Sequence, residues 1–345
     1  MSKTYLITGV GSHLGGTVAA MLLAAGARVR GFAQPEADVS ALENEGLCLY
    51  FGDIRDKLSL RPLFEGIDGP FVVIHAAGMV SFETGKNPLL EEINVGGTEN
   101  VLALCREYGA QKLIHVGSVQ AIPTLPQGQP MREVKRFAPE RLQSEYARSA
   151  AVATQRVLDA AAAGLNATVV QPSGMIGPND YAAGYMTQLV LRFMRGRLPG
   201  FIRGGYDFVD VRDVADGVLR AAEKGAPGEC YILSGHYCTI RELLRTLSRI
   251  LGRRELKTAV PLWLARLSAP LAELLYKIRR KAPAFSRHVL DALIGNGLYS
   301  SAKAARELGY APRSMSDTLR DTVAFLRQQG RSTLPRRPGR GAAPV

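Results

Sequence analysis

A glycine-rich turn near the start of the chain constrains the fold more than any other feature. The apolar segment Thr4–Thr8 leads directly into Gly9-Val10-Gly11-Ser12-His13-Leu14-Gly15-Gly16, and an apolar-periodic helix follows. Glycine allows positive φ angles and a close approach to a pyrophosphate, whose charge then rests on N–H groups at the helix N-terminus. The turn meets two of the three positions in both the G-x-G-x-x-G and the G-x-x-G-x-x-G template. It indicates a dinucleotide site, and the alternative is an ordinary strand-to-helix turn.

Strands and helices alternate along the first two-thirds of the chain. This alternation predicts an α/β fold of the Rossmann type, in which a doubly wound parallel sheet carries helices on both faces. The expected strands are Thr4–Thr8, Ala27–Ala33, Leu47–Phe51, Phe71–His75, Lys112–Gly117 and Asn166–Gln171, and the expected helices are Leu14–Ala25, Lys57–Gly66, Pro88–Tyr108 and Glu140–Ala163.

The pattern becomes helix-rich and irregular in the last part of the chain. Only short strands are expected there, at Tyr206–Val209 and Glu229–Leu233. We predict a dinucleotide-binding Rossmann domain over residues 1–181, to which parts of 205–235 return. A smaller, helix-rich substrate-binding region then covers 182–329, and residues 330–345 form a disordered basic tail.

The composition is that of a compact enzyme. Hydrophobic residues make up 46% of the 345 residues, which is enough for a full core. The formal net charge is +12, but the basic residues are thinly spread and lack interleaved aromatics, so nucleic acid is not expected as a partner. The four cysteines show no metal-ligand spacing, so no metal site is expected. No secretory segment precedes them, which favours a cytoplasmic location.

Further motifs follow the predicted strands at their carboxyl ends, where open α/β sheets bind ligands. They are Gly52-Asp53-Ile54, His75-Ala76-Ala77-Gly78, Asn94-Val95-Gly96-Gly97-Thr98, Val116-Gly117-Ser118, Tyr146 and Gln171-Pro172-Ser173-Gly174. In this order the set resembles the extended short-chain dehydrogenase/reductase family, of the NAD-dependent epimerase/dehydratase type. Within it the chain is most similar to the branch of dihydroflavonol reductases and 3β-hydroxysteroid dehydrogenases. The family pattern T-G-x-x-G-x-x-G selects the second glycine template, with Ser12 as the departure.

The resemblance implies a nicotinamide cofactor and a set of residues that bind it. Asp53 would accept a hydrogen bond from the adenine amino group, although a turn or cap role is its alternative. The end of the second strand carries neither the acidic residue typical of NAD sites nor the arginine typical of NADP sites, so both cofactors stay open. The implied cofactor-binding residues are Gly9, Gly11, Ser12, His13, Leu14, Gly15, Ala33, Gln34, Asp53, Ile54, Ala76, Ala77, Gly78, Tyr146, Pro172, Ser173 and Met175.

The resemblance also implies that Ser118 and Tyr146 are catalytic, with a lysine four residues after the tyrosine. A tyrosine pKa of about 10 is too high for a base at neutral pH, so a nearby cation must favour the phenolate. Residues i and i+4 share a helix face, which would place that lysine beside the ring. The lysine position in this chain is Ala150. Slow turnover, a substitute from a remote lysine or water, and binding without turnover are the alternatives.

The leading functional hypothesis is an NAD(P)-dependent oxidoreductase that interconverts a secondary alcohol and a ketone on a fairly apolar, steroid- or flavonoid-like small molecule. One alternative is a nucleotide-sugar epimerase or dehydratase, for which diphosphate-binding candidates are available at Arg192, Arg195, Arg197 and Arg203. The other alternative is a catalytically impaired NAD(P)-binding sensor or scaffold. A homodimer through the helices at 88–108 and 140–163 is a further expectation from the resemblance.

Residues 261–281 predict an amphipathic helical segment with one strongly apolar face. Trp263, Leu264 and Leu267 belong to that face, and Arg266 and Glu273 lie opposite. Three interpretations stay open: a bent helix pair packed over the core, a lid over a lipophilic substrate, or a basic patch in peripheral contact with a membrane. The charges inside the segment argue against a membrane-spanning helix.

Overall fold

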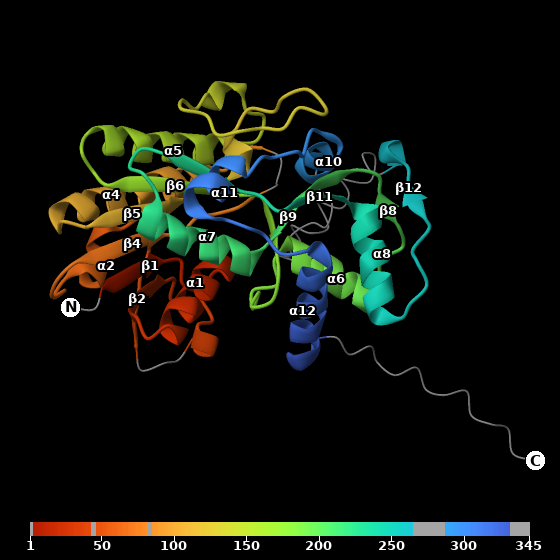
Figure 1. Cartoon of the computed structure of the whole chain (residues 1–345), viewed down its shortest axis with the longest axis horizontal. Helices are drawn as coiled ribbons and strands as arrows, with labels where there is room; N and C mark the ends of the chain where they lie inside the picture. Colours follow the sequence, from red (N-terminus) through yellow and green to blue (C-terminus); the bar gives the residue numbers. More distant parts are fainter. Residues whose placement is uncertain (1–2, 43–45, 82–84, 265–286, 332–345) are drawn as a thin grey trace, which may run out of the picture.

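A seven-stranded parallel sheet organises the N-terminal two-thirds of the protein (Figure 1). The computed structural model describes residues 3–42, 46–81, 85–264 and 287–331. The strand order is β10-β6-β5-β4-β1-β2-β3. Strands β2 and β3 are added on one side of β1, and the later strands are added on its other side, beginning with β4. In such a sheet a ligand crevice lies between the carboxyl ends of the two strands where the order reverses, here β1 and β4. The strands are β1 (Thr4–Thr8), β2 (Arg28–Ala33), β3 (Leu47–Phe51), β4 (Phe71–His75), β5 (Lys112–Val116), β6 (Ala167–Pro172) and β10 (Cys230–Leu233).

Helices cover both faces of this sheet, which explains why its central strands are apolar throughout rather than alternating. Every residue of β4 and of β6 is buried. One face packs against α1 (His13–Ala24), α7 (Val211–Lys224) and α11 (Ala302–Leu308). The other face packs against α2 (Lys57–Phe64), α4 (Gly97–Glu107) and α5 (Glu145–Ala162). The predicted Rossmann-type doubly wound fold is therefore confirmed.

The helical stretch predicted over residues 88–108 is present, but it is not one regular α-helix. It consists of α3 (Pro88–Glu91), a π-helical segment (Glu92–Gly96) and α4. A π segment widens the helix locally and is frequent at functional sites. Here it carries Asn94, whose side chain bonds the backbone of Met79 through both its oxygen (2.7 Å) and its nitrogen (3.0 Å). These hydrogen bonds to a distant part of the chain explain why the α-helix is interrupted at this point.

The helix predicted from Glu140 begins five residues later. Residues Pro139–Arg141 form a 3-10 turn, and Ser144 is extended with φ −93° and ψ 144°. The Ser144 side chain accepts a hydrogen bond from the Ala147 N–H at 3.0 Å, which makes it the N-cap of α5. This local cap overrides the helical tendency of the residues before it.

Two small sheets and several helices follow the large sheet. The first sheet joins β7 (Gly174–Ile176), β9 (Gly205–Asp210) and β11 (His236–Thr239), and the second joins β8 (Phe201–Ile202) and β12 (Ala259–Val260). The core of this region is built from α6 (Tyr185–Met194), α8 (Ile240–Leu251) and α12 (Met315–Gln328). A further helix, α10 (Arg287–Ile294), packs against β9. Strand β9 exceeds the expected 206–209 at both ends.

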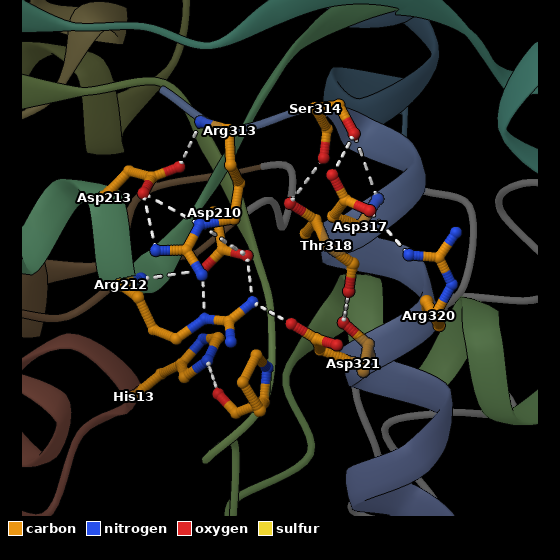
Figure 2. A network of polar contacts seen from close by, with 12 residues as sticks. His13, Asp210, Arg212, Asp213, Arg313, Ser314, Asp317, Thr318, Arg320 and Asp321 are labelled. Atoms are coloured by element: carbon orange, nitrogen blue, oxygen red, sulfur yellow. Dashed lines mark hydrogen bonds and ion pairs between the residues drawn. The ribbon is translucent and has the colours of Figure 1, made fainter. Parts of the chain in front are cut away.

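An ionic network ties α12 to β9 and α7 (Figure 2). Arg212 bridges the buried Asp210 and Asp321 of α12, each at 2.7 Å. Arg313 bonds Asp213 at 2.8 Å through its side chain and again through its backbone N–H. The N-cap of α7 is Asp210, whose carboxylate accepts a hydrogen bond from the Arg212 N–H.

The amphipathic segment at 261–281 lies mostly outside the described residues, and so do residues 332–345 of the predicted tail. At the beginning of that segment the Trp263 side chain is 67% exposed and Leu264 is 43% exposed. Across the part of the chain that the structure describes, no helix combines the length and the hydropathy needed to span a bilayer.

Candidate active site

The glycine-rich turn between β1 and α1 fits a dinucleotide pyrophosphate. Gly9 has φ +76°, and a Cβ on it would lie 2.7 Å from the Ala77 backbone. A Cβ on Gly15 would lie 2.2 Å from the Gly9 carbonyl oxygen. The first N–H groups of a helix have no partner within it, so those of His13 and Leu14 face the crevice as anion donors. Because Gly9 and Gly15 have no side chains, the backbone N–H groups of the turn stay accessible to a ligand.

Ser12, the departure from the glycine pattern, is the N-cap of α1. It is extended at φ −84° and ψ 164°, and its hydroxyl accepts a hydrogen bond from the Gly15 N–H at 3.1 Å. Serine is a preferred cap residue, so the substitution stabilises the helix that presents the phosphate donors. The next residue, His13, bonds the Pro178 carbonyl oxygen through Nε2 at 2.8 Å and so connects the turn to the loop after β7.

A cavity of about 540 Å³ lies at the carboxyl ends of the strands, and we call it the central cavity. It extends from the glycine turn to the C-terminal region, and both parts of the chain line it. The structure thereby brings together most of the residues predicted from the sequence. Those that line it are Ser12, His13, Leu14, Ala76, Ala77, Gly78, Ser118, Tyr146, Pro172, Ser173 and Met175, together with Ala150.

Seven of the predicted cofactor residues lie outside the lining of the central cavity: Gly9, Gly11, Gly15, Ala33, Gln34, Asp53 and Ile54. Both carboxylate oxygens of Asp53 accept bonds from the Arg55 guanidinium, the shortest at 2.6 Å, and these hydrogen bonds lower the pKa of Asp53. Ile54 is buried and packs against Gly97. Asp53 thus has the turn and ion-pair contacts of a structural residue, and its adenine contact stays a prediction.

Ser118 and Tyr146 meet at the centre of the central cavity. Ser118 is 8% exposed and caps the short 3-10 turn after β5. Burial raises the pKa of Tyr146 above its ordinary value, and a hydrogen bond with Ser118 partly offsets this rise. The phenol is consequently protonated at neutral pH and can donate its proton.

Ala150 is 7% exposed and lines the same cavity, so the space beside Tyr146 holds no side-chain cation from this helix position. Arg148 does not substitute for it: its Nε bonds the Leu142 carbonyl oxygen at 2.9 Å and its guanidinium pairs with Glu145.

The sequence contains two other Tyr-x-x-x-Lys spacings, Tyr108 to Lys112 and Tyr299 to Lys303. Both place their lysines away from Tyr146. Lys112 is the first residue of β5, at the end away from the cavity-lining His115 and Val116, and it donates to the Gly225 carbonyl oxygen at 2.5 Å. Lys303 pairs with Glu229 at 2.5 Å and bonds the Cys230 carbonyl oxygen at 2.8 Å. Both spacings are coincidental.

The sequence did not reveal a tyrosine pair beside the catalytic residues. Tyr206 of β9 lines the central cavity, and its hydroxyl lies 3.3 Å from that of Tyr299. Burial is the main reason that the pKa of Tyr206 is raised and that of Tyr299 reaches about 12. The neighbouring Asp207 has a pKa raised to about 6 by burial, against hydrogen bonds from Ser173 and Gly235. The sequence analysis predicted a strand at 206–209 but assigned no role to Tyr206 or Tyr299.

The outer wall of the central cavity is apolar. Its side chains come from α6, α8, α10 and the two small sheets: Met186, Leu189, Leu198, Phe201, Ile202, Phe208, Ile240 and Leu293. Among the four arginines proposed for a diphosphate, Arg192 lines the cavity, whereas Arg195 bonds the Arg331 carbonyl oxygen at 2.6 Å. Arg197 and Arg203 are exposed outside the lining.

Comparison with known proteins agrees with this geometry. The family model described as the NAD-dependent epimerase/dehydratase family matches residues 5–234, which hold the glycine turn, Ser118 and Tyr146. The chain belongs to the NAD-dependent epimerase/dehydratase family. The family predicted from the motifs is thus confirmed, and with it the binding of a nicotinamide dinucleotide as the family's cofactor class.

Relatives within this family include enzymes with apolar substrates in their names. The chain is 33% identical to sterol demethylase protein B of Methylococcus capsulatus, over 95% of this chain and 99% of that protein. It is 30% identical to the 4-hydroxy-2-methyl-3-oxo-4-farnesyl-3,4-dihydroquinoline-1-oxide ketoreductase of Stigmatella aurantiaca, over 96% and 98% respectively. UDP-glucose 4-epimerase of Thermotoga maritima shares the fold at 22% identity, with a TM-score of 0.77 over 94% of this chain and 99% of that chain.

Proposed function

We propose that the protein is an NAD(P)-dependent reductase that converts a ketone of an apolar small molecule into a secondary alcohol. The observation that carries the proposal is the central cavity itself, which joins the dinucleotide turn, the Ser118–Tyr146 pair and an apolar outer wall. The sterol and farnesyl-quinoline names of the two relatives support the same substrate class.

The protonation state of Tyr146 supports the reductive direction. The glycine turn would hold a reduced nicotinamide dinucleotide, which would supply the hydride to the carbonyl carbon as the C=O π electrons move to the carbonyl oxygen. Ser118 donates a hydrogen bond to that oxygen and Tyr146 donates its proton to it, which leaves a phenolate. Because burial keeps the phenol protonated at neutral pH, Tyr146 is prepared as an acid rather than as a base.

Neither cofactor form has a dedicated recognition group at the end of β2. Arg30 is turned toward backbone carbonyls, with bonds to Leu63 and to Gly66 at 3.3 and 2.9 Å. Gln34 is exposed and uncharged. We therefore propose that NAD and NADP bind with dissociation constants within about tenfold of each other. Titration of the protein with both reduced cofactors tests this, and a preference above about a hundredfold contradicts it.

A nucleotide-sugar reaction is supported less well by the site. A diphosphate needs several converging cations, and Arg192 is the member of the proposed set that lines the central cavity. The similarity to UDP-glucose 4-epimerase extends to the fold alone.

The test is a comparison of hydride transfer to apolar ketones and to nucleotide sugars. We expect ketosteroids or flavonoid-like ketones to be reduced, and Tyr146→Phe to lower the rate by about a hundred- to ten-thousandfold. Turnover restricted to nucleotide sugars contradicts the proposal. Tight cofactor binding without turnover, in both the natural chain and Ala150→Lys, would instead support the sensor or scaffold alternative.

A further inference from the structure

The loop between β7 and α6, residues 177–184, forms part of the wall of the central cavity, and we call it the wall loop. Asp180 and Ala182 of this loop line the cavity. Its backbone is unusual, since Asn179 has φ +67° and Ala183 has φ +53°. Residues with a side chain rarely adopt such left-handed angles unless the surrounding structure holds them there. The wall loop therefore depends on contacts with other parts of the molecule.

One of these contacts joins the wall loop to the dinucleotide turn. The carbonyl oxygen of Pro178 accepts a hydrogen bond from Nε2 of His13 at 2.8 Å. His13 begins α1, and its N–H is among those that face the phosphate site. Ser12, His13 and Leu14 line the same cavity as the wall loop. A displacement of the loop would therefore break a contact with the phosphate-binding turn.

A second set of contacts comes from Arg331, which lies three residues beyond the end of α12. Its guanidinium donates hydrogen bonds to the carbonyl oxygens of Asp180 and Tyr181, at 3.3 and 2.8 Å. The main chain of Arg331 is fixed as well. Its N–H donates to the Leu326 carbonyl oxygen at 3.2 Å, and the Arg195 guanidinium donates to its carbonyl oxygen at 2.6 Å. Arg331 is thus held at its backbone, and its side chain holds two consecutive carbonyl oxygens of the wall loop.

Helix α12 also packs against the wall loop. The ring of Tyr181 meets the ring of Phe325 edge-on, with the centroids 5.4 Å apart and the planes at 84°. Phe325 is buried and belongs to the core of the C-terminal region, where α12 lies beside α6 (Figure 1). The wall loop therefore connects two parts of the molecule: it bonds the glycine turn through Pro178, and it contacts the end of α12 through Arg331 and Phe325.

Arg331 also lies near the segment that follows β2. The pKa of Asp38 in that segment is lowered, mainly by hydrogen bonds from Ser40 and further by the positive charge of Arg331. The same segment packs closely on the glycine turn: a Cβ on Gly11 would lie 2.7 Å from the Cβ of Ala37. Arg331 is therefore close to both of the segments that flank the dinucleotide turn.

We propose that Arg331 is a positioning residue of the dinucleotide site: it holds the wall loop against the glycine turn and thereby slows the release of a bound nicotinamide dinucleotide. A guanidinium suits this task because its planar N–H groups reach two consecutive carbonyl oxygens at once, whereas a lysine ammonium is a compact charge on a flexible stem. The proposal requires that the chain bind the dinucleotide of its family. It goes beyond the proposed reductase function and does not depend on which substrate is converted.

The dissociation rate of the reduced dinucleotide tests the proposal, and stopped-flow fluorescence of the displaced cofactor measures it. We expect Arg331→Ala to raise this rate about tenfold and to leave the association rate within about twofold, because losing a contact of the bound state acts mainly on dissociation. Arg331→Lys keeps the charge but not the planar donor geometry, and it should raise the rate about threefold.

Arg327→Ala is the matched control. It removes an exposed arginine of α12 whose side chain has no hydrogen bond or ion pair in the part of the chain that the structure describes. We expect it to leave the dissociation rate within about twofold of that of the unchanged protein.

Amide hydrogen exchange of the free protein tests the same contact without cofactor or turnover. Arg331→Ala should speed the exchange of residues 179–184 about tenfold or more and leave that of α4 unchanged, because the wall loop loses two of the hydrogen bonds that hold it.

Three results overturn the proposal. The first is a dissociation rate for Arg331→Ala within about twofold of that of the unchanged protein, and the second is an equal rise in Arg327→Ala. The third is faster release with unchanged exchange of residues 179–184, which would mean that Arg331 acts through its charge rather than through the wall loop. If release and exchange change as expected but no ketone is reduced, the reductase function fails while the role of Arg331 stands.

Discussion

At the scale of single residues, Ala150 decides how the site works. The family resemblance identified residue 150 as the lysine position, but the sequence could not show what replaces it. The answer depends on tertiary packing, which brings Tyr206 of β9 close enough to Tyr146 to interact with it and adds His115 of β5 to the lining of the same cavity. Neither residue lies in a motif, so the sequence alone could not place them there.

Substituting Ala150 with the lysine of the family pattern should make the site better suited to alcohol oxidation. In Ala150→Lys an ammonium beside Tyr146 would stabilise the phenolate and make it a better base. We expect the rate of alcohol oxidation at neutral pH to rise about tenfold or more, and the pH at which oxidation reaches half its maximum to fall. The pH profiles of oxidation by the natural and substituted proteins check this. Superimposable profiles would count against the role assigned to residue 150.

The buried His115 should make the protein less stable as the pH falls. Its pKa is about 4 in the folded chain and about 6.5 when unfolded. Between these values the unfolded chain binds a proton that the native protein does not, so the stability is fully present above pH 6.5 and is lost as the pH falls toward 4. This residue alone should lower the free energy of unfolding by about 3 kcal/mol over this pH interval.

Chemical unfolding at several pH values measures that loss. His115→Asn removes one titrating group and should make the dependence of the unfolding free energy on pH shallower over this interval, while the buried His75, whose pKa is also lowered, keeps its share. His236→Asn, an exposed histidine of β11, is the control and should leave the slope as it is. Parallel curves for His115→Asn and the natural chain would show that His115 is not buried in its neutral form.

At the scale of elements, the hydrophobic pattern predicted the strands of the large sheet to within one residue at each end. Continuous apolar runs bounded by turn residues are reliable when both faces of a strand are buried. The helices were predicted less well where side chains form specific bonds. Asn94 lies in the π-helical segment and bonds the backbone of Met79. Ser144 caps α5, so that this helix begins later than predicted. Hydrogen bonds of this kind depend on partners that periodicity does not reveal.

The ionic network of Figure 2 should be a main determinant of how firmly α12 is held. Asp210→Ala would remove the buried carboxylate that pairs with Arg212 and caps α7. We expect a loss of about 3 kcal/mol in the free energy of unfolding, because the partly buried Arg212 guanidinium loses its buried partner and keeps only the more exposed Asp321. Urea unfolding measures it. Arg320→Ala, at an exposed pair with Asp317, is the control and should change little. Similar losses for both would mean that burial does not matter here.

At the scale of the whole molecule, two expectations await solution measurements. We propose that a homodimer forms through the face that α4 and α5 share, where Arg156 of α5 pairs with the exposed Glu99 of α4 at 3.1 Å. Light scattering should give twice the chain mass of 37.2 kDa, and a monomer at all concentrations contradicts it.

Peripheral membrane contact through residues 261–281 stays a prediction, for which binding to anionic vesicles is the measurement.

The central claim is that one cavity binds the dinucleotide, holds an apolar ketone and donates the Tyr146 proton without a lysine at residue 150. A single-turnover reaction with deuterium-labelled reduced cofactor and a steroid or flavonoid-like ketone tests it most directly. The account predicts deuterium on the carbinol carbon of the product, transferred about a hundredfold or more slowly by Tyr146→Phe. Product free of deuterium, from a protein that binds the cofactor and ketone together, would contradict it.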